Sequence, residues 1–179
     1  MINIIVAHCK NRGIGMSGKL PWYLPADLKR FKQLTCGNGT NGIIMGRKTW
    51  DSLPVKPLKY RRNIIISKTM SRELNPHLII KRNLHDAIEY GEYSLLKEIW
   101  IIGGSDIYNS AMKEYHIDNI HVTEIDTEFD CDRFLDPIPP NYKIKQEGEW
   151  KKTDYFKYRY VHYVNKTKPP FCKRLGYCM

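Results

Sequence analysis

The sequence has no apolar run that approaches the roughly 20 residues of a membrane-spanning helix. Its apolar start, residues 1–7, carries no basic leader, so we expect a first strand there rather than a signal peptide. Repeats, low-complexity tracts and linkers are also absent. A chain of 179 residues, 42% hydrophobic and 27% charged, is typical of one soluble globular domain. We expect a cytoplasmic monomer without a membrane segment.

Cysteine is scarce, and none of the residues forms a C-x-x-C pair: Cys9, Cys36, Cys131, Cys172 and Cys178. An odd number of cysteines without a secretory leader is typical of a reduced, intracellular protein. The spacing predicts no zinc site, so we expect no metal in the function.

Acidic residues are few relative to basic ones, with 19 Asp and Glu against 29 Lys and Arg and a net charge of +10. Residues 143–179 hold ten Lys and Arg but only three Asp and Glu, which places +7 of that charge at this end. Basic surfaces are typical of proteins that bind nucleic acid. One hypothesis is therefore a nucleic-acid-binding protein that uses the basic C-terminal region.

Short β-rich apolar runs alternate with segments of helical character. The predicted strands are Ile2–Ala7, Ile43–Met45, Asn63–Ser67, Leu78–Ile80, Ile99–Ile102 and Ile120–Ile125. The predicted helices are Ala26–Thr35, Lys48–Leu53, Leu84–Tyr90 and Ser105–Tyr115. This order predicts an α/β fold: a single domain with a central mixed, mostly parallel twisted sheet flanked by about four helices.

The last part of the chain changes character. Runs at Lys143–Trp150 and Tyr155–Asn165 flank a polar turn at residues 151–154, which predicts an antiparallel hairpin at the sheet edge. We expect the domain to cover residues 1–165 and a basic tail to cover residues 166–179.

The segment Gly37-Asn38-Gly39-Thr40-Asn41-Gly42 matches the dinucleotide fingerprint G-x-G-x-x-G letter for letter. That fingerprint follows a strand and opens a helix. Here the segment follows a predicted helix and leads into a predicted strand. We therefore interpret it as a glycine-rich connection.

Asp27 is the first candidate for chemistry. Pro25 suits the first position of a helix, which places Asp27 in the first turn, where a carboxylate often serves only as a favourable charge. Its neighbours favour another interpretation, because Trp22, Leu28 and Phe31 would surround the carboxylate with apolar groups. Burial would raise the pKa of Asp27 and allow it to bind a flat, protonatable heterocycle, with Lys32 near an anionic tail.

Two glycine-containing segments are candidates for phosphate binding. In Met45-Gly46-Arg47-Lys48-Thr49-Trp50 a strand passes into a helix beside two cations and a hydroxyl, although a solvated basic helix start would look the same. In Ile102-Gly103-Gly104-Ser105 a buried strand enters a turn that could also be tight without binding a ligand. We expect Ser105 to cap the following helix.

Taken in order, these segments resemble the dihydrofolate reductase family. The matching blocks are Leu20-Pro21-Trp22 with Asp27, Met45–Trp50, Arg61–Ser67, Ile102–Gly104 and Val122–Ile125. The resemblance covers about residues 1–165 and implies hydride transfer from NADPH to dihydrofolate, giving tetrahydrofolate for one-carbon metabolism and thymidylate synthesis. It also implies water as the direct proton donor to N5, and inhibition by antifolates.

The resemblance implies three catalytic residues. Asp27 would bind the pterin amino group and ring nitrogen, Thr123 would hydrogen-bond that carboxylate, and Trp22 would hold a water. The other substrate-binding residues would be Ile5, Ala7, Leu28, Phe31, Lys32, Leu53, Arg61 and Ile102, with Arg61 pairing the folate α-carboxylate. Arg61 and Lys32 argue against a reductase of the same fold whose substrate has no glutamate tail.

The resemblance also implies a site for NADPH. A mobile loop between Cys9 and Tyr23 would close over the nicotinamide. The cofactor-binding residues would be Ala7, Ile14, Gly15, Lys19, Leu20, Gly46, Arg47, Lys48, Thr49, Ser67, Lys68, Arg82, Gly103, Gly104, Ser105, Ile107 and Tyr108. Gly103-Gly104 matches a pair joined by a cis peptide bond in the family. Two positions depart from the family pattern: Tyr60 stands where glycine is common, and Asp106 lies near the expected phosphate.

Overall fold

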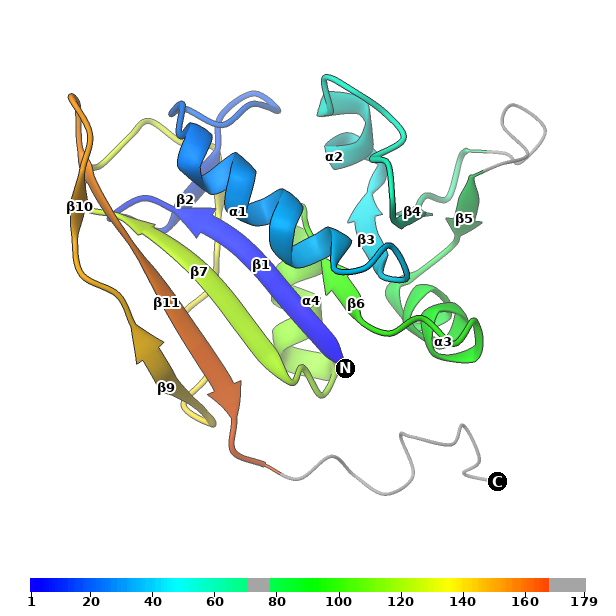
Figure 1. Cartoon of the computed structure of the whole chain (residues 1–179). Coiled ribbons are helices and arrows are strands. Elements are labelled where there is room, and N and C mark those ends of the chain that lie inside the picture. The colour runs from blue at the N-terminus through cyan, green and yellow to red at the C-terminus, as the bar shows by residue number, and fades with distance from the viewer. Residues whose placement is uncertain (71–77, 168–179) are drawn as a thin grey trace.

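The computed structural model describes residues 1–70 and 78–167 (Figure 1). Its helices are α1 (Pro25–Cys36), α2 (Arg47–Ser52), α3 (Leu84–Tyr93) and α4 (Ser105–Glu114). Its strands are β1 (Ile2–His8), β2 (Gly13–Gly15), β3 (Gly42–Gly46), β4 (Arg62–Ile66), β5 (Ile79–Lys81), β6 (Ile99–Ile101), β7 (Asn119–Ile125), β8 (Arg133–Phe134), β9 (Tyr142–Glu147), β10 (Lys151–Lys152) and β11 (Lys157–Asn165).

The main sheet has the order β10-β11-β7-β1-β6-β3-β4-β5, and β9 also pairs with β11. The pairs from β7 across to β5 are parallel, whereas β11 runs antiparallel to β7, β9 and β10. This confirms the predicted α/β fold with a mixed, mostly parallel sheet. The carboxyl ends of the parallel strands meet at one edge, where ligands bind in many α/β proteins.

Helices cover both faces of the sheet. Because successive strand residues point to opposite faces, Ile4 packs with buried residues of α3 and α4, and Ile5 packs on the side of α1 and α2. Figure 1 shows α1 lying across one face of the strands and α4 behind them. Burying one such side chain stabilises the fold by about 1.5–3 kcal/mol, so the doubly covered strands hold the edge of the sheet in place.

The end of α1 explains the fingerprint-like segment. Gly37 follows the helix with φ +51°, and the chain turns through residues 38–41 before β3 begins at Gly42. A left-handed φ at Gly37 suits a residue without a side chain. The prediction of a glycine-rich connection is confirmed.

The predicted hairpin is present, but its strand boundaries were wrong. The first strand ends at Glu147 rather than at residue 150, and Lys151–Lys152 form β10 instead of the turn. Residues 148–150 separate β9 from β10, and Gly148 still donates its backbone N–H to the carbonyl of Tyr160 on β11. The turn lies at residues 153–156, where the Thr153 hydroxyl accepts a hydrogen bond of 3.0 Å from the Phe156 N–H and so stabilises the turn.

Sequence analysis did not predict the two-stranded sheet of β2 and β8. It pairs Gly13 with Phe134 and Gly15 with Arg133. Both strands are too short to show a period, and β2 contains two glycines, which are disfavoured in strands. The small sheet fixes the segment after β1 against a distant part of the chain.

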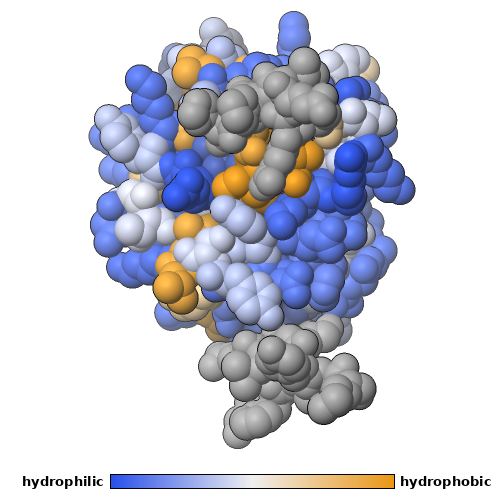
Figure 2. Space-filling model, turned by 90° about the vertical axis from the view of Figure 1, so that its right-hand side faces the viewer, coloured by the Kyte–Doolittle hydropathy of each residue, from blue (hydrophilic) through white to orange (hydrophobic). Residues whose placement is uncertain are grey.

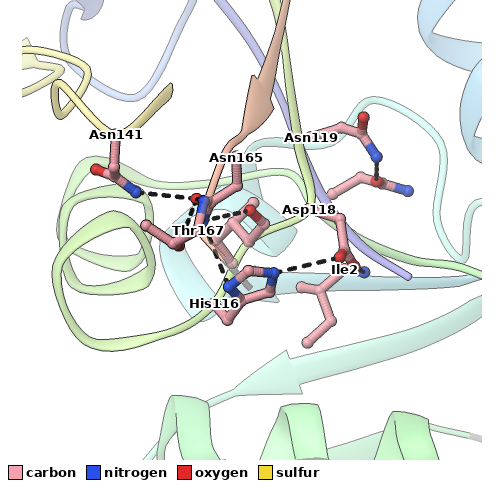
Figure 3. A network of polar contacts seen from close by, with 9 residues as sticks. Ile2, His116, Asp118, Asn119, Asn141, Asn165 and Thr167 are labelled. Atoms are coloured by element: carbon pink, nitrogen blue, oxygen red, sulfur yellow. Dashed lines mark hydrogen bonds and ion pairs between the residues drawn. The ribbon is translucent and has the colours of Figure 1, made fainter. Parts of the chain in front are cut away.

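A polar network fastens the amino ends of β1 and β7 to the end of β11 (Figure 3). The Asp118 carboxylate accepts a hydrogen bond of 2.8 Å from the backbone N–H of Ile2 and lies 3.5 Å from His116 Nε2. The side chain of Asn165 donates to the carbonyl of Ile117, and Thr167 donates to Asn165. This network lies at the end of the strands opposite to their carboxyl edge.

Figure 2 views the molecule from the side of β5, where hydrophilic residues cover most of the visible face and apolar residues form smaller areas between them. Within residues 1–70 and 78–167, no helix is long and apolar enough to cross a membrane. Most of the predicted basic tail, residues 168–179, lies outside the described residues.

Candidate active site

The candidate site begins with a contact between α1 and β7. The hydroxyl of Thr123 donates a hydrogen bond of 2.5 Å to Asp27 Oδ1. Thr123 is completely buried, and Asp27 is half-buried. The N-cap of α1 is Leu24, and Asp27 points its carboxylate at the sheet rather than serving only as a first-turn charge. The structure therefore brings together the two residues that sequence analysis predicted to interact.

Burial raises the pKa of Asp27, as sequence analysis predicted, because the charged form loses water. The hydrogen bond from Thr123 and the positive charge of Arg30 act in the opposite direction. Trp22 is buried nearby in a separate apolar cluster, with its ring centroid 5.6 Å from that of Phe129. The carboxylate is thus partly shielded from solvent and can accept hydrogen bonds from a flat ligand.

The apolar residues predicted for the substrate lie on β1 and α1 and directly after β6 and α2. Ile5 and Ile102 are buried in one cluster, and Phe31 and Leu53 pack against it as partly buried side chains. Leu28 is 50% exposed, and Ala7 packs instead with the cluster that contains Trp22. The structure places Phe31 and Leu53 with the two isoleucines, whereas Leu28 is open to solvent.

The Ile5 carbonyl has a partner from α4. Tyr108 donates its hydroxyl hydrogen to this oxygen over 2.8 Å. Tyr108 is buried, and its ring lies beneath Gly103, where an added Cβ would come within 3.3 Å of the ring. A buried tyrosine therefore holds the backbone carbonyl of Ile5, one of the predicted substrate-binding residues.

Arg61 lies at the far end of α1 from Asp27. Its guanidinium donates to Thr35 Oγ1 over 2.7 Å and to the Lys59 carbonyl over 3.1 Å. The same guanidinium lies 5.7 Å from the centroid of the Phe31 ring. Lys32, which follows Phe31 on α1, is exposed. The turn before Arg61 is formed although Tyr60 must adopt a φ of +61°.

The two predicted phosphate segments lie side by side. The backbone N–H of Gly46 donates to the carbonyl of Gly103 over 2.8 Å, and the Gly103-Gly104 peptide bond is cis. A Cβ at Gly104 would lie 3.4 Å from the hydroxyl of Thr49, and one at Gly46 would lie 3.5 Å from Ile107. The sheet therefore joins two motifs that are far apart in the sequence into one glycine-lined surface.

Polar residues border this surface. Arg47 and Lys48 are exposed, and Arg47 Nε lies 3.8 Å from Asp51 Oδ2 in an exposed contact. The expectation that Ser105 caps α4 was wrong, because the N-cap is Gly104 and Ser105 is the first helical residue. Asp106 is exposed in the first turn of the same helix.

The predicted adenosine-end residues also come together. The Arg82 guanidinium donates to the carbonyls of Ser67 and Lys68. The Ser67 hydroxyl accepts hydrogen bonds from the backbone N–H groups of Thr69 and Met70. Arg82 and Lys68 are exposed, so both cations can reach an anion in solution.

The segment 9–23, predicted to be a mobile loop, is attached to the rest of the chain through β2. Gly15 accepts a hydrogen bond from the Asp132 N–H, and the Asp132 carboxylate accepts one from Ser17. Ile14 packs against the main core, whereas Lys19 and Leu20 are exposed. Ile14 and Gly15 are therefore held against the rest of the chain, whereas Lys19 and Leu20 face solvent.

Sequence analysis missed Arg30. It lies three residues after Asp27, a spacing that places two side chains on one helix face. That spacing was a signal, but a cation beside a first-turn acid is usually solvated. The burial of Arg30 depends on Tyr160 of β11, over whose ring the guanidinium lies at 4.4 Å.

The structure is thus an α/β protein in which a half-buried acid, an apolar cluster and two joined glycine segments lie toward the carboxyl ends of the parallel strands. A model of the dihydrofolate reductase family matches residues 1–165. The chain is 36% identical over 149 residues to dihydrofolate reductase of Drosophila melanogaster, which covers 79% of this chain and 82% of that protein. It is 38% identical over 147 residues to dihydrofolate reductase of Heliothis virescens. That alignment covers 76% of this chain and 80% of that protein.

The chain belongs to the dihydrofolate reductase family. It is also 37% identical over 147 residues to bifunctional dihydrofolate reductase-thymidylate synthase 2 of Arabidopsis thaliana, covering 75% of this chain and 26% of that protein. The chain thus spans about a quarter of the length of that bifunctional relative. The alternative hypothesis of a nucleic-acid-binding protein has no support from these relatives.

Proposed function

We propose that this chain reduces 7,8-dihydrofolate to 5,6,7,8-tetrahydrofolate with hydride from NADPH. The observation that carries the proposal is the half-buried Asp27 carboxylate, held by Thr123 one helical turn before Phe31, which packs against the apolar cluster of Ile5 and Ile102. A pterin presents an amino group and a ring N–H on one edge, which match a carboxylate that can accept two hydrogen bonds. The Thr123 hydroxyl uses one lone pair of Oδ1, so Oδ1 and Oδ2 can each still accept one hydrogen bond from the pterin.

The remainder of the substrate extends along α1. Phe31 and Leu53 would contact the aminobenzoyl ring, with Leu28 covering it from the solvent side. Arg61 would pair with the α-carboxylate, because a planar guanidinium matches the two oxygens of a carboxylate. Its contacts with Thr35 and Lys59 hold the guanidinium in place before substrate arrives. Lys32 would assist with the charge of the tail.

The residues present also fit a phosphorylated dinucleotide. A Cβ at Gly104 would reach the hydroxyl of Thr49, so the bare glycine leaves room for close approach of a ligand. Arg47 and Lys48 supply exposed positive charge near this surface, and Lys68 and Arg82 supply it near Ser67. These cations favour a dinucleotide with an additional phosphate, which is the difference between NADPH and NADH. When bound, NADPH supplies the hydride that is transferred to C6 of the pterin.

We assign a positioning role to Asp27 in the proton transfer. Its carboxylate would hold the pterin by the edge remote from N5, so water would deliver the proton to N5. Asp27 orients and polarises the ring, and Trp22 would hold a water on the carboxylate side. The exposed residues Lys19 and Leu20 would close over the ligands and exclude bulk water, which places donor and acceptor together.

A spectrophotometric assay tests the proposal. The absorbance of NADPH should fall only when dihydrofolate is added, and an antifolate should stop the loss. NADH at the same concentration should support a slower reaction. A chain that oxidises NADPH equally well without dihydrofolate, or that gives no reaction with both present, would not have the proposed activity.

A further inference from the structure

Arg30 is a partly buried cation that the proposed mechanism does not use. It lies on α1 one turn after Asp27, where side chains three residues apart are neighbours. Its guanidinium carbon lies 4.4 Å from the centroid of the Tyr160 ring. Its Nη1 atom is buried and has no hydrogen-bond partner. A buried guanidinium loses hydration, so its position requires compensating interactions.

The sheet register explains why Arg30 and Asp27 share one environment. Tyr160 of β11 pairs directly with Thr123 of β7, and Thr123 holds Asp27. The two partners therefore stand on the same face of the sheet, side by side below α1. Asp27 contacts one of them and Arg30 covers the other, so the two opposite charges are held close by different anchors.

Because Thr123 holds Asp27 and Tyr160 holds Arg30, the Asp27 carboxylate stays available to a ligand. Within the described residues, Arg30 forms no ion-pair contact with Asp27, unlike Arg159, whose Nε lies 2.7 Å from Glu124. A forked arginine contact would occupy the oxygen atoms that a pterin needs. The aromatic face of Tyr160 holds the guanidinium instead, through a cation–π contact.

We propose that Arg30 is a positioning residue that keeps the half-buried Asp27 carboxylate ionised for ligand binding without occupying its oxygen atoms. The pKa values agree in direction with this geometry. Burial raises the pKa of Asp27, and Arg30 lowers it. Burial lowers the pKa of Arg30, and Asp27 followed by Tyr160 raises it. The two charged groups thus stabilise each other's charged forms.

Other titratable groups face this pair from β7, β9, β10, β11 and α4. Burial, followed by the charges of His162, Arg30 and Lys145, lowers the pKa of His121 to about 3. Burial, then Lys145 and Arg30, lowers the pKa of His162 as well. Burial raises the pKa of Tyr160 to about 12, and burial also raises the pKa of Tyr108. These four groups are uncharged near neutral pH.

Two charged or polar groups remain at the border of the cluster. Lys151 Nζ of β10 lies 5.2 Å from the centroid of the Tyr160 ring, and the Tyr158 ring packs edge-on against that ring with the centroids 5.6 Å apart. Lys151 is exposed, so solvent screens its charge. Arg30 is therefore the partly buried cation of this cluster that acts on Asp27.

The test follows the Asp27 carboxyl in ligand-free protein by ¹³C NMR as a function of pH, with the spectrum of Asp27→Asn identifying the signal. Arg30→Met should move the titration midpoint upward by about one pH unit or more. Arg30→Lys retains the charge and should keep the midpoint close to that of the wild type. The matched control Lys29→Met removes an exposed charge from the same helix and should move the midpoint by less than about 0.3.

Binding of a 2,4-diaminopyrimidine antifolate gives a second readout. At pH below both midpoints, Arg30→Met should bind this probe about tenfold more weakly than the wild type, because each pH unit corresponds to a factor of ten. The difference should disappear at higher pH. A structural role alone would weaken binding equally at every pH.

The inference rests on the proposed function for the identity of the ligand, but the titration does not require the reaction. A chain without dihydrofolate reduction that still shows the Arg30-dependent midpoint would retain the inference and lose the proposed function. An unchanged midpoint in Arg30→Met, or an equal change in Lys29→Met, overturns it. Arg30→Gln replaces Arg30→Met if circular dichroism shows that the latter is unfolded.

Discussion

Thr123 on β7 donates a hydrogen bond of 2.5 Å to the Asp27 carboxylate on α1 and so joins the helix to the centre of the sheet. The hydroxyl stabilises the ionised form of the acid, which burial disfavours. The proposed substrate site therefore depends on two residues that lie 96 positions apart in the sequence and meet where α1 contacts β7.

Thr123→Val removes this hydroxyl while nearly keeping the side-chain shape. The pKa of Asp27 should rise further, because one of the two opposing interactions is lost. A hydrogen bond to a charged group contributes about 1.5–3 kcal/mol, so the KM for dihydrofolate at neutral pH should rise at least about tenfold. Steady-state kinetics measure the change. Thr123→Ser keeps the hydroxyl and is the control; equal KM values for the valine and serine variants would contradict the assignment.

Arg61→Lys keeps the positive charge but loses the planar guanidinium. Lysine cannot reproduce the forked contact with a carboxylate or the simultaneous contacts with Thr35 and Lys59. The KM for dihydrofolate should rise about tenfold or more, while kcat stays within about twofold. Arg62→Lys, an exposed neighbour on β4, is the matched control. A normal KM in Arg61→Lys would remove this residue from the site.

His121→Phe tests the polar cluster under α1. The pKa of His121, about 3 in the folded chain, lies below its unfolded value of 6.5. The unfolded chain therefore binds more protons between these values, and stability falls as the pH decreases from about 6.5, by at most about 1.4 kcal/mol per pH unit for one proton. Between pH 6 and 4.5, the variant should lose less stability than the wild type in urea denaturation. His85→Phe, at an exposed position of α3, should follow the wild type; a parallel loss in His121→Phe would contradict the prediction.

Tyr60→Gly tests the turn before Arg61. Tyr60 is 70% exposed and has a φ of +61°, a conformation that costs a residue with a side chain about 1–2 kcal/mol. Relief of this cost should offset the greater freedom of glycine in the unfolded chain, so stability should stay the same or rise by up to about 1 kcal/mol. Tyr155→Gly, at an exposed residue of the β10–β11 turn, should destabilise the chain by about 0.5–1 kcal/mol. Thermal unfolding distinguishes the two, and a comparable loss at Tyr60 would contradict the interpretation.

Local patterns were sufficient to predict much of the fold. The continuous apolar run at Ile99–Ile102 predicted a strand covered on both faces, and β6 lies between β1 and β3 with helices on each side. The position of Pro25 predicted the start of α1. Short strands were not predictable in the same way, because β2 and β8 have two or three residues and depend on pairing across the chain.

The same distinction between local patterns and contacts across the chain applies to the residues of the candidate site. The burial of Asp27 followed from neighbours on its own helix, and its partner Thr123 followed from the family resemblance. Arg30 was missed because the ring that covers it belongs to β11, and no local pattern shows which face of α1 that strand will meet. Ser105 was expected to be a cap because its residue type favours caps, but Gly104 is the N-cap and Ser105 is the first helical residue.

The central claim is that Asp27 holds the substrate for reduction, and Asp27→Asn tests it most directly in the dihydrofolate-dependent NADPH assay across a range of pH. At pH 7, kcat/KM should fall at least about 100-fold, and the gap from the wild type should narrow in acid, where substrate already carries a proton. Asp154→Asn, in an exposed turn, should leave the profile unchanged. An asparagine variant with wild-type turnover at neutral pH would contradict the account.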